Sequence, residues 1–557
     1  MRTLKRPLAA ACLFAVLAGA AAQENPMPFR GAGGIGSVAM PASFALAATW
    51  DLALVREANE VIGRELRARG VRLALGPSLE IARDPRRGQV EHSFGEDPFL
   101  VGEMGVAAIE GLHGSTPATL AVAVGPWAGP QPPAPDSVAG PAPVAERELR
   151  ETYFPPFEAA IRRAKVDAIV ASRADVDSIP AHANRWLQGV LRDELKFTGA
   201  LLAAPGGIAD LHKVYGVAAT KVDAERIARA AGLEAELQLP AVSSTSLGHL
   251  PQGGDAIAAK VAQRSIILLK NDGALPLEAK SKVAVVEAGR LNSVPGATLR
   301  KLLAPRAQEG LKGATHVVVV VGDTGTEAAL KAMEAAKSAT LPVIVVYTGA
   351  RVELDARVAD AANALVAAWG LDKQAPRAIA DVLSGTVNPG GKLPVTIARN
   401  PGQLPLFYNA KPSARRGYLF DTSDPLFPFG WGLGYSAFEL GAPVLSGPSM
   451  PIDGSIRVSV EVRNAGSRAG DETVQLYVRD KIGSIARPVK QLKGFQRVTL
   501  AAGEKRTVTF TLEASALEMW DDRMRRAVEP GEFDVMTGAN SAQLQTTTLT
   551  VLGRSDK

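Results

Sequence analysis

The stretch KFTGALLAAPGGIADLH, residues 196–212, has the pattern of a buried strand that runs into a helix. Residues 200–204 form a short apolar run, residues 205–207 (Pro-Gly-Gly) interrupt it, and helical spacing resumes at Ile208. In α/β folds with parallel strands, catalytic side chains stand at the carboxyl end of such a strand. Here that end carries Ala204, which has no reactive group.

The segments around this stretch alternate between helix and strand patterns. From 30 to 240, amphipathic stretches such as 51–70 separate short apolar runs such as 71–82, which is typical of βαβ units and a parallel sheet. A second α/β unit at 255–440 has continuous Val, Ile and Leu runs, as expected for strands covered on both faces. From 443 to 557 apolar and polar residues alternate, which predicts an antiparallel β-sandwich.

The first 22 residues have the composition of a secretory signal peptide. Three basic residues precede the apolar run 8–17, and Ala20-Ala21-Ala22 offers small residues for cleavage. The sequence therefore predicts an exported protein, periplasmic or secreted, and the apolar run is too short to anchor it in a membrane. The only cysteine, Cys12, lies in this segment, so the mature chain would have neither a disulfide nor a thiolate metal site.

Composition excludes several classes of function. The 557 residues are 46% hydrophobic and 21% charged, which is typical of a soluble globular protein with several cores. The net charge of +5 includes the three basic residues of the signal peptide, and no basic tract predicts binding to nucleic acid. No long apolar segment predicts a membrane span. The histidines 92, 113, 182 and 212 lack metal-ligand spacing, so neither a metal nor another cofactor is expected.

Ordered motifs along most of the mature chain resemble glycoside hydrolase family 3, the group of β-glucosidases and β-xylosidases. The motifs are MPASFALAATWD (40–51), RDPRRGQVEHSFGEDPFLVGEMG (83–105), RSIILLKNDGALPL (264–277), NPGGKLPVTI (388–397), PLFPFGWGLGYSAFE (425–439), NAGSRAGDETVQLYVRD (464–480) and RPVKQLKGFQRVTLAAGE (487–504). The resemblance implies a (β/α) barrel, an α/β sandwich and a fibronectin-III-like β-sandwich, with sugar bound between the first two domains.

The same resemblance argues against a complete barrel. The family normally has a further strand and helix before residues 40–51, whereas here the signal peptide nearly abuts that region. The connection between the first two domains is also reduced, to about residues 236–255. We therefore expect a barrel domain at 30–240 that does not close, since it lacks parts of the eight-stranded pattern, followed by the α/β sandwich at 255–440.

The family's chemistry is retaining hydrolysis, which needs two carboxyl groups about 5–5.5 Å apart on either side of the anomeric carbon. The aspartate that serves as nucleophile in the family pattern falls on Ala204, and a methyl group cannot attack that carbon. Other sugar contacts of the family are replaced as well, with Gly125 and Pro126 in place of a Lys-His pair and Arg173 and Ala174 in place of a Tyr-Asn pair.

Four residues remain as candidates for the site. Glu327, in the shortened loop that would bring the acid/base, is either that acid/base or an ordinary first-turn glutamate favoured by the helix dipole. Glu80 stands in place of an aspartate in the family's pocket, and Arg83 follows it in the ARDP motif. Arg173 either binds an anionic sugar, pairs with Glu80 or fills space in a plain ion pair. A fifth residue, Asp210, lies near Ala204 in sequence, but its helical position favours solvated surface over a displaced nucleophile.

Three hypotheses for the function follow. The first is an exported family-3 homologue without turnover that binds a carbohydrate or contacts a partner. The second is an active β-glycosidase with rearranged carboxylates. The third is a structural module without ligand, whose former pocket would be filled by side chains such as Trp127 and Arg173. The sequence indicates neither the sugar nor the oligomeric state.

Overall fold

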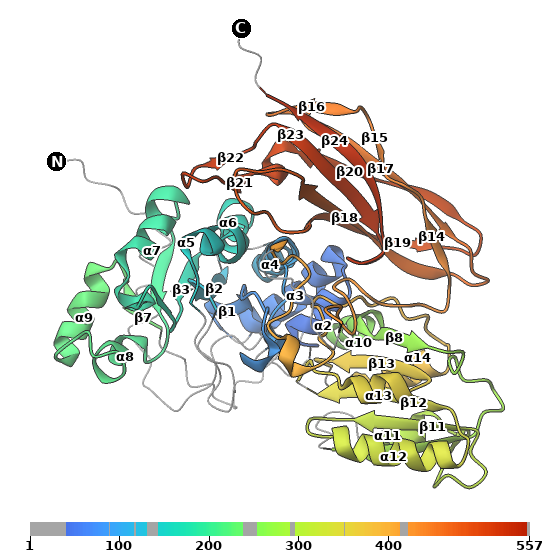
Figure 1. Cartoon of the computed structure of the whole chain (residues 1–557). Coiled ribbons are helices and arrows are strands. Elements are labelled where there is room, and N and C mark those ends of the chain that lie inside the picture. The colour runs from blue at the N-terminus through green and yellow to red at the C-terminus, as the bar shows by residue number, and fades with distance from the viewer. Residues whose placement is uncertain are drawn as a thin grey trace, which may run out of the picture.

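The computed structural model describes residues 40–68, 70–87, 90–115, 119–130, 143–237, 253–289, 296–349, 351–371, 373–412 and 422–553. The predicted signal peptide (1–22) and most of the shortened connection at 236–255 lie outside these ranges. Among the described residues, no helix has the length and apolar character needed to cross a bilayer. Figure 1 shows three domains in chain order, coloured blue to green, green to orange, and orange to red.

The first domain is built on a five-stranded parallel sheet in the order β1-β2-β3-β6-β7. Its strands are β1 (Leu73–Ser78), β2 (Ala121–Trp127), β3 (Ala168–Ala171), β6 (Ala200–Ala203) and β7 (Ala235–Glu236). In the described part of the chain β1 and β7 are the two edges and do not pair with each other. The expectation of an incomplete barrel is therefore confirmed for these residues.

Helices of the first domain cover one face of this sheet. They are α2 (Ser43–Ala48), α3 (Leu52–Ala68), α4 (Pro98–His113), α5 (Glu146–Glu148), η5 (Leu149–Tyr153), α6 (Pro155–Arg162), α7 (Arg185–Gly189), η7 (Val190–Glu194), α8 (Gly207–Lys213) and α9 (Lys221–Ala230). Helices α3 and α4 approach closely because Gly63 and Gly111 have no side chain. A Cβ on Gly63 would lie 2.5 Å from the Leu112 carbonyl oxygen, and one on Gly111 would lie 2.3 Å from that of Arg56.

Side chains of the sheet alternate between two apolar clusters, as the two-residue period of a strand requires. Val122, Ile169 and Leu201 join the large core beneath the helices. Their neighbours on the other face form a smaller cluster, whose fully buried members are Ala123, Ala168, Val170, Ala200, Leu202, Ala204 and Leu237. Ala204 thus belongs to the face of the sheet that points away from α3, α4 and α6.

The second domain has a six-stranded sheet in the order β10-β9-β11-β12-β13-β8. Its elements are β8 (Ile267–Asn271), β9 (Val283–Ala288), β10 (Ala307–Gln308), β11 (His316–Val321), β12 (Val343–Gly349), β13 (Ala364–Trp369), α10 (Gly254–Ser265), α11 (Gly296–Leu302), α12 (Thr326–Ser338), α13 (Ala356–Ala361) and α14 (Ala375–Leu383). Only β8 runs antiparallel, at one edge beside β13. Apolar clusters lie on both faces of the sheet, as its continuous Val and Ile strands predicted.

The third domain is an antiparallel β-sandwich. Its strands are β14 (Phe438–Leu440), β15 (Val444–Leu445), β16 (Ser449–Pro451), β17 (Ser455–Asn464), β18 (Gly470–Asp480), β19 (Gln491–Leu500), β20 (Lys505–Glu513), β23 (Gly531–Gly538) and β24 (Leu544–Leu552), with a small hairpin of β21 (Met519–Trp520) and β22 (Arg526–Ala527). Strands β17 and β20 pair over nine residues in one sheet, and β18, β19, β23 and β24 form most of the other. Alternate residues of β17 are buried, which is the pattern that predicted the sandwich.

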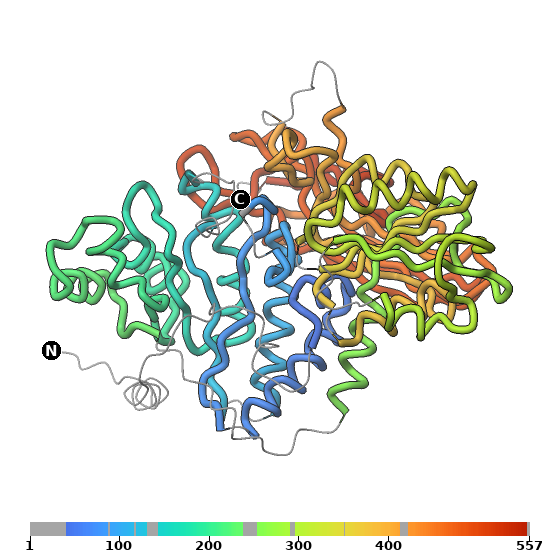
Figure 2. Tube along the Cα trace, turned by 90° about the horizontal axis from the view of Figure 1, so that it is seen from below, coloured from blue at the N-terminus to red at the C-terminus, as the bar shows by residue number. Residues whose placement is uncertain are grey.

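Buried polar groups join the three domains. The Lys392 ammonium, in the motif GGKLP, lies 2.7 Å from the Glu472 carboxylate of the third domain, and the Trp50 indole of the first domain donates to the Lys392 carbonyl at 3.2 Å. The Glu96 carboxylate accepts hydrogen bonds from the Thr396 amide (2.7 Å), the Thr396 hydroxyl (2.7 Å) and the Tyr408 amide (3.0 Å). Figure 2 shows the first and second domains side by side, with the third domain against both.

Candidate functional site

The carboxyl end of β6 is where the sequence places the lost nucleophile. Ala204 follows the last residue of β6 and is buried in the small apolar cluster of the sheet. The Ala204 carbonyl accepts a hydrogen bond from the Gly207 amide at 2.9 Å, and Gly206, with a φ of 75°, lets the chain turn directly into α8. The predicted strand and helix of residues 196–212 are thus confirmed, and the end of the strand presents a methyl group.

His182 lies against this end of the strand. The Ala204 amide donates a hydrogen bond to His182 Nε2 at 3.0 Å, and His182 is buried in the short helix η6 (Ala181–Ala183). Burial lowers the pKa of His182 to about 4, so the imidazole is neutral at neutral pH and its Nε2 acts as an acceptor. Gly207 has no side chain to collide with this ring, since a Cβ there would lie 2.3 Å from Nε2. The histidine therefore fixes the strand end and offers no free base.

Arg173 and Asp210 form an ion pair beside His182. The Arg173 Nε lies 2.9 Å from Asp210 Oδ2, and a second guanidinium nitrogen contacts the same oxygen. The Arg173 side chain is 48% exposed and that of Asp210 only 15%. Of the roles considered for Arg173, the structure shows an ion pair, with Asp210 as the partner and not Glu80. The expectation that Asp210 is solvated helix surface is wrong, because its side chain is mostly buried and pairs with the guanidinium of Arg173.

A second carboxylate, Glu236 in β7, lies near this pair. Burial first, and the nearby Asp210 charge as well, raise the pKa of Glu236, while a hydrogen bond from the Gly206 amide acts in the opposite direction. Sequence patterns did not indicate Glu236, because β7 contributes only two residues and lies 26 positions beyond Asp210. Asp210 and Glu236 are thus two carboxylates at the end of the strand that carries Ala204, and both have partners in the protein.

A cavity of about 910 Å³ lies between residues 143–146, the segment 175–179 that follows β3, and the start of α7. Its walls combine polar groups of Asp175, Asp177, Ser178 and Asn184 with the indole of Trp186. Trp186 is 36% exposed, and its ring lies 6.1 Å from that of Phe154. An aromatic face with several hydrogen-bonding groups suits a sugar, which has both C–H faces and hydroxyl groups.

Arg83 and Glu80, two of the predicted sugar contacts, form hydrogen bonds within the protein. The Arg83 guanidinium donates to Asn409 at 3.0 Å, contacts Glu148 and lies 4.2 Å from the centre of the Phe407 ring. Arg83 thereby ties the first domain to the segment around residue 408. Glu80 is partly buried, and its carbonyl accepts a hydrogen bond from the Ser93 hydroxyl at 2.6 Å.

Glu327 lies in a different part of the molecule. It occupies the first turn of α12, its side chain is 80% exposed, and its carboxylate pairs with Arg357 at 2.9 Å. In both views α12 and α8 lie on opposite sides of the molecule (Figures 1 and 2). The structure thus does not bring Glu327 together with Ala204, Arg173 or Glu80.

Trp127 does not fill the region beyond β6. Its ring stacks on Phe154 at 4.4 Å and meets Phe157 edge-on at 5.1 Å, between the sheet and the helices. The indole nitrogen donates to the Leu187 carbonyl at 3.2 Å. Within the described ranges, no group of three or more His, Cys, Asp or Glu side chains is arranged to hold a metal ion.

Comparisons with known proteins agree with the fold and place the chain in a family. Residues 30–263 match the glycosyl hydrolase family 3 N-terminal domain, residues 266–435 match its C-terminal domain, and residues 472–541 match a fibronectin type III-like domain. A β-xylosidase from Formosa agariphila is 31% identical over 92% of this chain and 87% of its own length. The chain therefore belongs to glycoside hydrolase family 3.

Other relatives and solved structures support the same assignment. A periplasmic β-glucosidase from Salmonella typhimurium is 28% identical over 91% of this chain and 83% of its own length. The structure of a β-glucosidase from Erythrobacter marinus has a TM-score of 0.86 and is 28% identical, covering 92% of this chain and 85% of that chain. The Formosa alignment runs over 640 positions, more than the 557 residues here, so that relative has internal segments that this chain lacks.

Proposed function

We propose that this chain is an exported family-3 homologue that binds a carbohydrate and does not hydrolyse it. One observation carries the proposal: the position of the nucleophile holds Ala204, and its methyl group is buried in an apolar cluster. Loss of a nucleophile costs an enzyme about 10⁶-fold in kcat. The nearby carboxylates of Asp210 and Glu236 accept bonds from Arg173 and Gly206.

Two features support retention of a ligand. The cavity that follows β3 is lined by Trp186 and by polar side chains, and Trp127 is not among its lining residues, because it packs under the helices. Structural relatives with this fold also bind sugars, such as the Listeria innocua β-glucosidase solved with glucose, which has a TM-score of 0.82.

The proposal of export is supported by the composition of residues 1–22 and by the name of the periplasmic relative.

Calorimetric titration of the mature chain with cello- and xylo-oligosaccharides tests binding. We expect a saturable heat signal that weakens at least about tenfold in affinity in Trp186→Ala, which removes the aromatic wall. Ile482→Ala is the matched control, because Ile482 is an exposed apolar residue of the third domain. No heat with any neutral glycan would favour the module without ligand.

The second candidate function is hydrolysis by rearranged carboxylates. It is favoured by the proximity of Asp210 and Glu236 and by the raised pKa of Glu236, which is the property of a general acid. Hydrolysis of aryl β-glucosides or β-xylosides that disappears in Asp210→Asn and Glu236→Gln would establish it. We expect instead a rate equal to that of buffer for all three proteins.

A further inference from the structure

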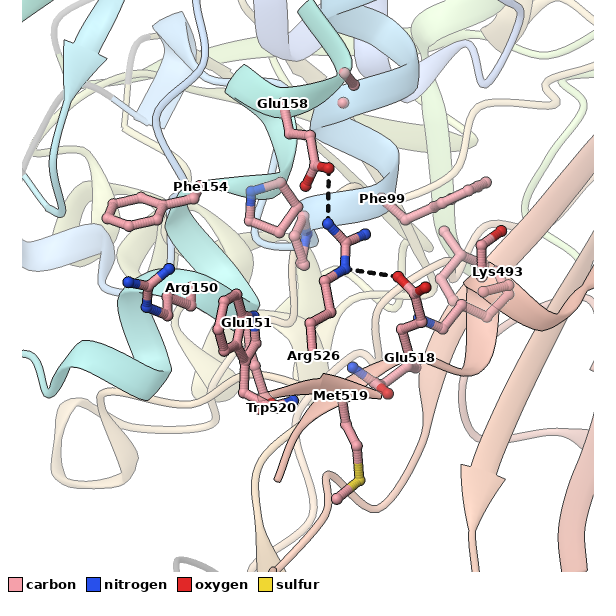
Figure 3. Close-up of a pocket in the computed structure, with 18 of the residues that line it drawn as sticks. Phe99, Arg150, Glu151, Phe154, Glu158, Lys493, Glu518, Met519, Trp520 and Arg526 are labelled. Atoms are coloured by element: carbon pink, nitrogen blue, oxygen red, sulfur yellow. Dashed lines mark hydrogen bonds and ion pairs between the residues drawn. The ribbon is translucent and has the colours of Figure 1, made fainter. Parts of the chain in front are cut away.

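A cavity of about 800 Å³ between the first domain and the β-sandwich lies outside the site described above. Its walls come from α4, η5 and α6 on one side and from β19, β21 and β22 on the other. A volume of this size is typical of sites for small molecules. Figure 3 shows Lys493 and Phe99 on one side of this cavity, with Arg150 and Phe154 on the opposite side.

Most cations of the cavity are already neutralised. Arg526 pairs with Glu158 at 2.7 Å and with Glu518 at 2.6 Å, and Arg487 pairs with Glu151 at 2.7 Å. Arg150 and Arg163 have carboxylate partners as well. The pairs of Arg526 with Glu158 and of Arg487 with Glu151 cross the boundary between the domains and hold the two walls together.

Lys493 is the exception. Within the described part of the chain, its ammonium group has neither a hydrogen bond nor an ion pair, although burial around it lowers its pKa to about 8. Two carboxylates, Asp97 and Glu151, act on Lys493 through their charge, but both make their hydrogen bonds to other residues. Asp97 accepts bonds from the Leu100 amide and the Tyr408 hydroxyl, and Glu151 accepts from Arg487 and the Trp520 amide. A partly buried ammonium group without a direct hydrogen-bond or ion-pair partner is costly, and a bound anion would supply that partner.

Aromatic rings form other parts of the cavity wall, and neighbouring side chains pack against them. The Arg150 guanidinium lies 4.3 Å from the centre of the Trp520 ring, and Phe99 packs edge-on against Phe495 at 6.3 Å. In the β21–β22 hairpin, Trp520 lies directly opposite Arg526, so both side chains point to the same side. Among the described residues, the walls of the cavity thus combine apolar aromatic faces with a lysine that has no direct ion-pair partner.

We propose that this cavity binds a carboxylate-bearing saccharide, such as a uronic acid unit, with its carboxylate on the Lys493 ammonium and its ring against the aromatic walls. Arg487 and Arg526 add positive potential at Lys493, while Asp97 and Glu151 add negative potential there. The feature that favours an anion is therefore the Lys493 ammonium itself, which can donate charge-assisted hydrogen bonds to a carboxylate. The site is separate from the end of β6 and depends on no catalytic residue.

Calorimetric titration of the full chain with digalacturonate tests the proposal, with xylobiose, acetate and phosphate as the other arms. We expect digalacturonate to bind, acetate and phosphate to bind at least about tenfold more weakly, and Lys493→Met to lose at least about tenfold in affinity. The control Lys505→Met removes an exposed lysine of the same domain, paired with Glu461, and should bind as the unaltered chain does. Affinity should fall as the pH rises from 7 to 9.5, because the lysine that pairs with the anion loses its proton.

A second measurement does not depend on the folding of a variant. Acetylation of the unaltered chain by an active ester at pH 7.5, followed by peptide mass spectrometry, should show Lys493 protected by digalacturonate and not by xylobiose. Three results would each overturn the proposal. They are equal binding of digalacturonate by Lys493→Met, binding of phosphate as tight as that of digalacturonate, and acetylation of Lys493 that the ligand does not change. Failure here does not affect the Trp186 proposal, because that site is tested with neutral glycans and Trp186→Ala, whereas this cavity is tested with digalacturonate and Lys493→Met.

Discussion

At the junction of the first two domains, the Glu96 carboxylate accepts three hydrogen bonds from residues about 300 positions away, whereas at the end of β6 a methyl group lies where the family has a carboxylate. Around Glu96 every polar contact serves to hold two domains together. Around Ala204 the polar groups satisfy one another locally, as Arg173 does with Asp210. The residues that join the domains are thus different from those at the end of β6, and the proposed function requires that the first set be kept while the second has changed.

The junction should be the most sensitive point of the molecule. Glu96→Ala leaves the Thr396 and Tyr408 amides without acceptors, and each buried unsatisfied group costs about 1–3 kcal/mol. We expect the free energy of unfolding in urea to fall by about 3 kcal/mol or more. Glu327→Ala, at an exposed pair, should change it by less than about 0.5 kcal/mol and serves as the control. Equal effects of the two substitutions would contradict the comparison.

The junction should also depend on pH. Burial raises the pKa of Glu96 to about 7, whereas a glutamate in the unfolded chain titrates near 4.3. Between these values the folded state keeps a proton that the unfolded state has released, so the contribution of Glu96 to stability is greatest below about pH 4.3 and is lost as the pH rises to about 7.

The variant Glu96→Gln cannot titrate at this position. From pH 4.5 to pH 7.5 the unaltered chain should therefore lose about 3 kcal/mol of unfolding free energy relative to the variant. Urea unfolding at several pH values measures it. A difference that stays constant with pH would show that Glu96 is ionised throughout.

Restoring a carboxylate at the end of β6 should not restore the reaction. Ala204→Asp places a carboxylate in the apolar cluster beside neutral His182, which should cost about 2 kcal/mol of stability. We expect no hydrolysis of 4-nitrophenyl β-glucoside or β-xyloside, because Glu327 pairs with a residue in another part of the molecule, and the nearby Asp210 and Glu236 already have partners. Turnover in this variant would mean that only a single residue separates the chain from an active enzyme.

The smallest effect is expected at the Arg173–Asp210 pair. Arg173 is about half exposed, so solvent screens the pair and Arg173→Ala should lower the free energy of unfolding by less than about 1 kcal/mol. Thermal unfolding measures this, and Arg357→Ala at the surface of the second domain is the matched control. A loss as large as that in Glu96→Ala would mean that the end of β6 supports the fold as strongly as the junction does.

Local patterns were sufficient to predict β6 and α8, because Pro205 and two glycines interrupt the chain where the strand ends. They were also sufficient for the continuous strands of the second sheet and the alternating strands of the sandwich. Contacts between distant residues were not predictable in this way. Asp97 caps the start of α4 through a local hydrogen bond, but nothing in the sequence indicates that Glu96 reaches Thr396. For the same reason the partner of Arg173, 37 residues away, and the nearby Glu236 were missed.

Covalent trapping tests the central claim most directly. A retaining glycosidase forms a glycosyl-enzyme through its carboxylate nucleophile, and an activated 2-deoxy-2-fluoroglycoside lets that intermediate accumulate. Incubation of the mature chain with the gluco and xylo forms of this reagent, followed by mass spectrometry of the intact protein, should show an unmodified mass. An added fluoroglycosyl group that maps to Asp210, Glu236 or any other acidic residue would contradict the account.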